Sequence, residues 1–306
     1  MSLMSEKRVG IFGLGKMGKN IAMQMLGKGY SVFAFNRSEA PLKEVSEKGA
    51  VPASSLPDLV EKLGEGRIVW IMLPAGEPTD KAIADLSMLL KPGDIVIDGS
   101  NSRYTDSIRH SGLLEAKGIK YLDAGCSGGP SGALKGMCMM VGGDRVTYER
   151  CESLFKDLSV KGGCAYMGPA GSGHFVKMVH NAIEYGMMQS IAEGADLMAN
   201  GPYPDLALGK IMKLWQNGSV VRSYLVELAG QALERDPKLG EVKPYVEDNG
   251  EGRWASQAAI ELGVPLTVLT HSIYERFSSR NDYQFSRRLL AALRHEFGGH
   301  EVRKAD

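Results

Sequence analysis

The segment RVGIFGLGKMG, residues 8–18, joins a short β-rich run to a glycine-rich turn and the start of a helical pattern. A GxGxxG turn between a strand and a helix lets backbone N–H groups and the helix dipole receive a pyrophosphate. Glycine-rich turns are common, but here strand, turn, helix and second strand follow in order. We therefore predict a dinucleotide-binding turn formed by Gly13, Leu14, Gly15, Lys16, Met17 and Gly18.

Up to about residue 170, β-rich runs alternate with amphipathic helical patterns, which is typical of a mostly parallel α/β sheet of the Rossmann type. The expected strands cover residues 8–12, 30–35, 67–73, 94–98 and 120–123. Beyond the glycines at 171 and 173 the patterns are helical, over 174–200, 204–215, 221–234 and most of 251–297. We predict a Rossmann domain over residues 1–170 and an all-helical domain over 171–306, which binds substrate, mediates oligomerisation and ends in a tail.

The charge of the chain is balanced, with 36 basic and 36 acidic residues. This balance argues against nucleic-acid and membrane partners, so an anionic ligand must be held by local charge. The four cysteines (126, 138, 151 and 164) are too far apart for a CxxC redox or zinc motif. No apolar run approaches the roughly 20 residues of a membrane span. We expect a cytoplasmic protein. We also expect no metal, since His295-Glu296 and His300 do not form an HExxH zinc helix.

Polar or glycine-rich residues follow several expected strands, where ligands of parallel sheets bind. The second strand ends in Asn36-Arg37-Ser38 instead of the acidic residue that accepts ribose hydroxyls in NAD-binding domains. Asn36 does not repel a 2′-phosphate, and Arg37 and Ser38 can donate hydrogen bonds to it. This pattern favours NADP as the cofactor and leaves NAD open. The alternative is that Arg37 is merely solvated and binds no cofactor. Other such loops contain Leu73, Pro74, Ala75 and Asn101, and the segment CSGGPSGA, residues 126–133. Asn101 can also be a simple turn residue.

The helix that begins near residue 174 carries a polar stripe at i, i+3, i+4 and i+7, formed by Lys177, His180, Asn181 and Glu184. Tyr185 borders this stripe. The opposite face has apolar residues at 176, 179, 183 and 187, which we expect the helix to bury. Lysine and glutamate on a helix often form only a solvated face, but a lysine close to a bound nicotinamide is suited to remove an alcohol proton.

Together these segments resemble 6-phosphogluconate dehydrogenase over nearly the whole chain, most specifically in GHFVKMVHNAIEYG (173–186). The segment RHEFGGH (294–300) resembles the family's tail motif, in which an arginine and a histidine bind substrate. The resemblance implies oxidative decarboxylation of 6-phosphogluconate to ribulose 5-phosphate and CO2 with NADP or NAD, in the pentose phosphate pathway and gluconate utilisation. It implies Lys177 as the base and Glu184 as the acid that protonates C1 of the enediol that remains after CO2 is lost.

The resemblance also implies a set of substrate-binding residues. The carboxylate and hydroxyls would be held by Asn101, Ser127, Gly128, Gly129, His180 and Asn181. The phosphate end would be surrounded by Tyr185, Arg253, Arg280, Arg294 and His300. The chain is expected to form a homodimer or homotetramer whose tail completes a neighbouring site.

This sequence departs from the family in three places. It is much shorter than the long-form enzymes, Arg253 and Ala255 replace a lysine and a threonine, and Arg280 matches the family's arginine only with a shifted register, so Arg287 is the alternative. A rival interpretation is another β-hydroxyacid dehydrogenase, of the 3-hydroxyisobutyrate or tartronate semialdehyde type, whose substrates carry no phosphate. A more remote one is a non-catalytic NADPH-binding regulator.

Overall fold

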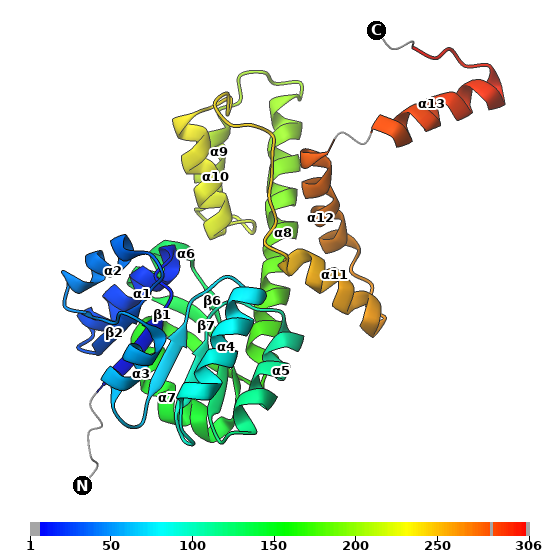
Figure 1. Ribbon diagram of the computed structural model, residues 1–306. Coiled ribbons are helices and arrows are strands. Elements are labelled where there is room, and N and C mark those ends of the chain that lie inside the picture. The colour runs from blue at the N-terminus through cyan, green and yellow to red at the C-terminus, as the bar shows by residue number, and fades with distance from the viewer. Residues whose placement is uncertain (1–6, 282–283, 304–306) are drawn as a thin grey trace. The chain divides into compact units, whose positions relative to one another are not determined.

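The computed structural model describes residues 7–281 and 284–303, and the chain divides into two compact units, one up to His180 and one from Asn181 onward (Figure 1). The division falls inside helix α8 (Ser172–Ala199). The boundary that the sequence predicts at residue 170 lies just before this helix and stays a prediction.

The first unit is built on an eight-stranded sheet in the order β3-β2-β1-β4-β5-β6-β7-β8. Neighbouring strands are parallel except for the antiparallel pair β6 and β7, which confirms the predicted mostly parallel Rossmann-type sheet. The strands are β1 (Arg8–Phe12), β2 (Ser31–Phe35), β3 (Val51–Pro52), β4 (Ile68–Ile71), β5 (Ile95–Asp98), β6 (Lys120–Ser127), β7 (Met137–Gly143) and β8 (Ser159–Gly168).

The sequence predicted five of these strands within a few residues and missed β3, β7 and β8. β3 is only two residues long, and the sequences of β7 and β8, MCMMVGG and SVKGGCAYMG, are rich in glycine, methionine and cysteine instead of β-branched residues. β6 also extends four residues beyond its predicted end. These strands form because tertiary pairing at the edge of the sheet outweighs weak local propensity.

Helices cover both faces of the sheet, and alternate strand residues enter two separate hydrophobic cores. Trp70 of β4 packs in the core under α1 (Lys16–Gly27), α2 (Glu39–Ser46), α6 (Gly129–Lys135) and α7 (Arg145–Leu158). Its neighbours Val69 and Ile71 pack in the other core, under α3 (Leu56–Leu63), α4 (Glu77–Leu89) and α5 (Tyr104–Glu115). This alternation follows from the two-residue period of a strand, and it leaves the strand ends as the place for a ligand.

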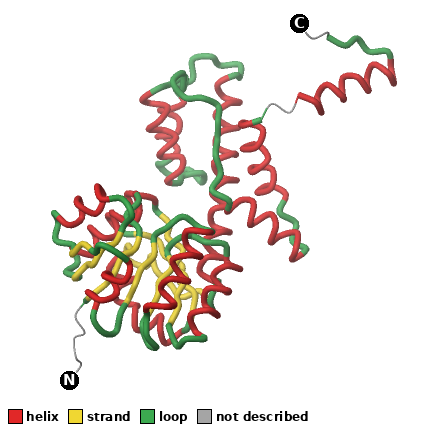
Figure 2. The backbone as a smooth tube through the Cα atoms, viewed as in Figure 1, coloured by secondary structure: helices red, strands yellow, loops and turns green. Residues whose placement is uncertain are grey.

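From Asn181 onward the described residues form helices and loops only (Figure 2). The rest of α8 is followed by α9 (Leu208–Trp215), α10 (Tyr224–Arg235), α11 (Glu251–Leu262), α12 (Thr267–Arg280) and α13 (Gln284–Gly298). A small core of Met212, Val226 and Leu233 joins α9 to α10, whereas α13 has no buried residue. This confirms the predicted helical C-terminal part. None of the described helices is long and apolar enough to cross a membrane.

One expectation about α8 is wrong for the single chain. The apolar stripe that we expected to be buried includes Ile183 and Met187, which are 48% and 41% exposed. Instead, the polar residues Lys177 and Asn181 are buried. The apolar face therefore has too few contacts within one chain to be covered.

Candidate active site

The glycine turn between β1 and α1 has the shape that a bound pyrophosphate requires. A Cβ at Gly18 would collide with the Gly13 carbonyl oxygen, so only glycine allows α1 to begin this close to β1. Around a Cβ at Gly15, in contrast, there is no heavy atom within 4 Å among the described residues. Gly15 is thus the position at which a phosphate can approach the backbone N–H groups and the N-terminus of α1. The geometry fits the pyrophosphate of a dinucleotide.

Asn36, at the end of β2, holds the glycine turn in place. Its Oδ1 accepts a hydrogen bond from Leu14 N at 2.9 Å, and its Nδ2 donates to Ser38 O at 2.9 Å. Arg37 and Ser38 are exposed beside it, and Ser38 is the N-cap residue of α2. The side chains available to select the cofactor's ribose are therefore those of Arg37 and Ser38.

The loops after β4 and β5 are connected by side chains. The Thr79 hydroxyl in α4 lies 2.8 Å from Pro74 O, in the predicted Leu73-Pro74-Ala75 loop, and 3.0 Å from Ser100 Oγ. Asn101 has a left-handed backbone, with φ of 52°, and its amide spans the end of β6 by accepting from Cys126 N at 3.0 Å and donating to Cys126 O at 3.3 Å. Asn101 therefore fixes the adjoining ends of β5 and β6.

The beginning of α8 is anchored by a buried carboxylate that the sequence analysis did not single out. Asp123 of β6 accepts hydrogen bonds from Gly171 N at 2.7 Å and from His174 N at 2.8 Å. A carboxylate at this position satisfies helix N–H groups and complements the helix dipole. Its place at the end of a predicted strand was the only signal in the sequence.

Lys177 lies one turn further along α8 and is 5% exposed. It packs against Gly125 of β6, where a Cβ would collide with the Lys177 Cβ. Two residues further along β6, Ser127 Oγ lies 3.3 Å from His180 Nε2. The glycines that follow, Gly128 and Gly129, both have positive φ and lead into α6. Lys177, His180 and Ser127 are thus brought together around the end of β6.

In the second unit, Asn181 and Tyr185 of α8 hold the segment that leads into α11. Asn181 Nδ2 donates to Glu251 Oε1 at 3.0 Å, and both side chains are buried. The Tyr185 hydroxyl accepts from Asn249 N at 3.2 Å, and the Arg276 guanidinium stacks 3.6 Å from the centre of the Tyr185 ring. Burial raises the pKa of Tyr185. Glu184, between them, is half-buried.

Two of the predicted phosphate-binding arginines share a buried carboxylate. Arg253 donates to Asp248 through Nε at 2.9 Å and Nη2 at 3.0 Å, and Arg280 Nη2 donates to it at 2.7 Å. The hydrogen bonds from Arg253, and then those from Arg280, lower the pKa of Asp248 to about 2 although its burial opposes this shift. The two guanidiniums are therefore held side by side on one carboxylate. Sequence reasoning missed Asp248.

Other predicted substrate-binding residues are not brought to this cluster. Arg294 and the alternative Arg287 are exposed on α13, and His300 is exposed after it, where its backbone oxygen lies 2.9 Å from His295 Nδ1. Among the described residues, no group of three or more His, Cys, Asp or Glu side chains could hold a metal ion.

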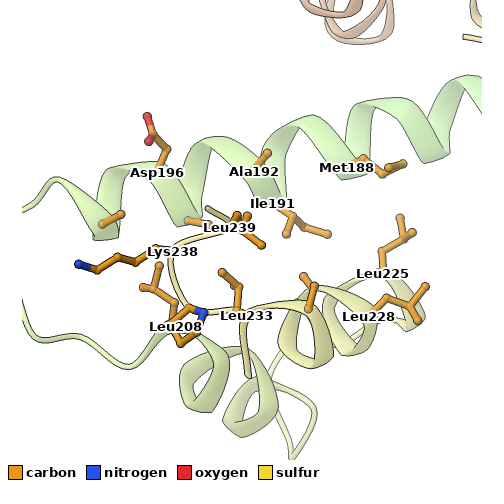
Figure 3. A pocket seen from close by; sticks show the side chains of 15 residues that line it. Met188, Ile191, Ala192, Asp196, Leu208, Leu225, Leu228, Leu233, Lys238 and Leu239 are labelled. Atoms are coloured by element: carbon orange, nitrogen blue, oxygen red, sulfur yellow. The ribbon is translucent and has the colours of Figure 1, made fainter. Parts of the chain in front are cut away.

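A cavity of about 660 Å³ lies between the second half of α8 and the pair α9 and α10 (Figure 3). Its lining is mostly apolar and includes Met188, Ile191, Leu208, Leu225, Leu228 and Leu233. None of the predicted site residues lines it, so this cavity is separate from the residues described above.

The fold and the glycine turn define the class of this protein, a nicotinamide dinucleotide-dependent oxidoreductase. Residues 8–168 match the NAD binding domain of 6-phosphogluconate dehydrogenase, and residues 173–301 match the C-terminal domain of 6-phosphogluconate dehydrogenase. The chain belongs to the 6-phosphogluconate dehydrogenase family.

Relatives named as enzymes of this family are similar along the whole chain. The NAD(+)-dependent, decarboxylating enzyme of Haloferax volcanii is 42% identical over 301 residues, which are 98% of this chain and 99% of the relative. That of Bacillus subtilis is 37% identical over 89% of this chain, which spans only 61% of that longer relative.

One solved structure is named for the same family, and a second shares only the fold. The Plasmodium falciparum 6-phosphogluconate dehydrogenase, solved with NADP+ and with 6-phosphogluconate, is 28% identical with a TM-score of 0.82 and covers 97% of this chain and 66% of its own. A Mycobacterium tuberculosis 3-hydroxyisobutyrate dehydrogenase, 24% identical with a TM-score of 0.73 and aligned over 89% of this chain and 94% of its own, shares the fold.

Proposed function

We propose that this chain oxidises and decarboxylates 6-phosphogluconate to ribulose 5-phosphate and CO2 while it reduces a nicotinamide dinucleotide, as a step of the pentose phosphate pathway. The observation that carries the proposal is Lys177, buried on α8 against Gly125 beside the ends of the parallel strands. A lysine that is shielded from water close to the cofactor domain suits a base that acts on an alcohol.

The reaction assigns distinct tasks to the two residues on α8. When bound, the oxidised nicotinamide supplies an acceptor for the hydride that leaves C3. Neutral Lys177 takes the proton of the C3 hydroxyl, which leaves a 3-keto acid and a protonated lysine. As the C1 carboxylate leaves as CO2, the electron pair moves into the ketone, and the Lys177 ammonium donates a hydrogen bond to the enolate oxygen. Glu184 then acts as the acid that donates a proton to the carbon that carried the carboxylate, which is C2 of the substrate and C1 of ribulose 5-phosphate.

The substrate would be held by two sets of residues. We assign its carboxylate and hydroxyls to Asn101, Ser127, Gly128, Gly129, His180 and Asn181, and its phosphate end to Tyr185, Arg253, Arg280, Arg294 and His300. The pair of guanidiniums on Asp248 supports this assignment, because the carboxylate holds two side chains that are suited to bind a phosphate next to one another.

We propose NADP as the preferred cofactor. Asn36 is committed to the glycine turn, and the exposed Arg37 and Ser38 can donate to a 2′-phosphate. Both relatives compared above are named as NAD(+)-dependent, whereas the Plasmodium falciparum structure contains NADP+. Measuring kcat/KM with each cofactor distinguishes these alternatives.

We also propose a homodimer or homotetramer in which the C-terminal tail completes a neighbouring site. Support comes from apolar side chains that one chain leaves exposed, among them Ile183 on α8 and Phe285 and Phe297 on α13. Light scattering gives the oligomeric state. Mixing a Lys177→Ala chain with an Arg294→Ala chain should restore activity if the tail acts on its neighbour, and no recovery after subunit exchange would refute this arrangement.

The test of the function is the formation of reduced cofactor from 6-phosphogluconate with NADP or NAD, with released CO2 trapped and 3-hydroxyisobutyrate run in parallel. We expect reduced cofactor and CO2 in equal amounts from 6-phosphogluconate. No reaction with 6-phosphogluconate and turnover of an unphosphorylated hydroxyacid would refute the proposal and assign the chain to the wider β-hydroxyacid group. Binding of cofactor without any turnover would indicate the regulator.

A further inference from the structure

A buried network of charged side chains lies where β5 ends. Asp98 is fully buried and His110 of α5 is 1% exposed. Asp98 accepts hydrogen bonds from the Tyr121 hydroxyl at 2.9 Å and from Ser100 N at 2.9 Å. His110 places Nε2 2.7 Å from Asp80 Oδ1 and Nδ1 3.8 Å from Asp98 Oδ2. None of these side chains has a role in the reaction proposed above.

The network supports the loops at three strand ends. The bond from Ser100 N to Asp98 fixes the turn after β5, and the Ser100 hydroxyl lies 3.0 Å from that of Thr79, which also contacts Pro74 O after β4. The next residue, Asn101, spans the end of β6. A shift of the Asp98 carboxylate would therefore move the loops that are expected to line the cofactor.

The position of His110 between two carboxylates favours one protonation state. A neutral imidazole has a single N–H, and if Nε2 donates it to Asp80, Nδ1 turns a lone pair toward the Asp98 carboxylate. An imidazolium has an N–H for each carboxylate and compensates the charge of Asp98. Nδ1 has no hydrogen-bond partner among the described residues, which leaves it available for Asp98.

Several groups face this histidine from the surrounding elements. Asp80 comes from α4, Asp98 from β5 and the ring of Tyr121 from β6, with Arg109 beside His110 on α5. His174, at the start of α8, also lowers the pKa of Asp98 through its charge. Asp98 and Asp80 raise the pKa of His110 more than the neighbouring Arg109 lowers it, and Arg109 itself pairs with Asp80 at 2.8 Å.

We propose that His110, as an imidazolium, is a positioning residue for the nicotinamide cofactor. It is the counter-ion of Asp98, and it fixes the Asp98–Ser102 loop and, through Thr79, the Leu73–Ala75 loop at the ends of β4 and β5. The proposal concerns cofactor binding and does not require a particular substrate.

The pKa directions agree with the geometry. Burial lowers the pKa of His110, but Asp98 and then Asp80 outweigh it and raise the pKa above its ordinary 6.5. Burial raises the pKa of Asp98, whereas the interaction with His110, 3.8 Å away, and the charge of His174 bring it down to about 2. The stability that His110 contributes to the folded protein is therefore complete below pH 6.5 and is lost as pH rises through its raised pKa. The stability that Asp98 contributes is present above pH 3.8 and is lost as pH falls toward about 2.

The experiment measures the dissociation constant of reduced cofactor, NADPH or NADH, by its fluorescence from about pH 6 to about pH 9. In the unmodified protein we expect binding to weaken about tenfold as His110 loses its proton. His110→Gln should bind with the weakened constant at every pH. His271→Gln, on the exposed surface of α12, is the matched control and should follow the unmodified protein.

Asp80→Asn provides a second test, because Asp80 is partly exposed and its loss removes one carboxylate from His110 without placing a new group in the core. We expect the weakening to begin at lower pH in this variant. The proposal is overturned if binding by the unmodified protein is independent of pH, or if Asp80→Asn leaves the midpoint of the weakening unchanged. Because no turnover is measured, either failure is distinguishable from a failure of the proposed reaction.

Discussion

Replacing Gly125 with alanine should displace Lys177, the proposed base. The new Cβ would collide with the Lys177 Cβ and would lie 3.0 Å from the Gly173 carbonyl oxygen and 3.1 Å from the Lys177 Cγ, where ordinary contact begins at 3.4 Å. Relief requires β6 and the first turn of α8 to separate, and overpacking of this kind costs about 1–3 kcal/mol. Because a catalytic group misplaced by about 1 Å can cost a hundredfold, we expect kcat to fall about a hundredfold.

The matched control is Gly112→Ala in α5, where a Cβ meets no heavy atom within 4 Å among the described residues. Alanine in a helix interior is favoured over glycine by about 0.5–1 kcal/mol, so this variant should be slightly stabilised with an unchanged kcat. Thermal unfolding and kcat at saturating substrate are measured for both variants. Equal stability and equal kcat in the two would refute the packing argument, and a destabilised Gly125→Ala with normal kcat would remove Lys177 from the base role.

Four further substitutions test single features of the structure. Lys177→Arg should bind cofactor normally but lose nearly all turnover, because a guanidinium does not deprotonate in proteins; near-normal kcat would contradict the mechanism. Asp123→Asn loses one of two backbone hydrogen bonds at the start of α8, made at 2.7 and 2.8 Å, and should lower the free energy of unfolding by about 1–3 kcal/mol in urea titrations. Arg37→Ala should reduce the kcat/KM ratio of NADP over NAD about tenfold, whereas Lys43→Ala, on exposed α2, should leave it unchanged. Asp248, with a pKa lowered to about 2, stabilises the fold above its ordinary 3.8, so the stability gap to Asp248→Asn should be constant near neutral pH and shrink as pH falls toward 2; a gap independent of pH would show that the arginines are not held by its charge.

The sequence predicted those parts of the fold that short segments determine. The strand, glycine turn and helix over residues 8–18 form as predicted because the glycine turn tightly constrains the backbone between strand and helix. The polar stripe with Lys177 follows from the helical period. The strands β7 and β8 could not be predicted, because their glycines and methionines carry little intrinsic preference and their pairing partners lie elsewhere in the chain. The apolar face of α8 was misjudged because helical period alone does not say what covers a face.

Partners of charged residues were equally beyond the sequence. Asp248 and Arg280 are 32 residues apart, and Asp80 and His110 are 30 apart, so no local pattern connects them. A single histidine within an amphipathic helix such as α5 is normally interpreted as a surface residue. Only the packing of α5 on the sheet shows that His110 lies between the carboxylates of Asp98 and Asp80.

Three asparagines that the sequence associated with ligands share a further property. Asn36, Asn101 and Asn181 each use the side-chain amide in hydrogen bonds within the protein, to Leu14 N, to the backbone of Cys126 and to Glu251, respectively. An amide both donates and accepts, so Asn101 can bond the N–H and the carbonyl of one residue together, which a carboxylate cannot do. These residues therefore fix the loops first and can contact a ligand only from positions that the protein has already set.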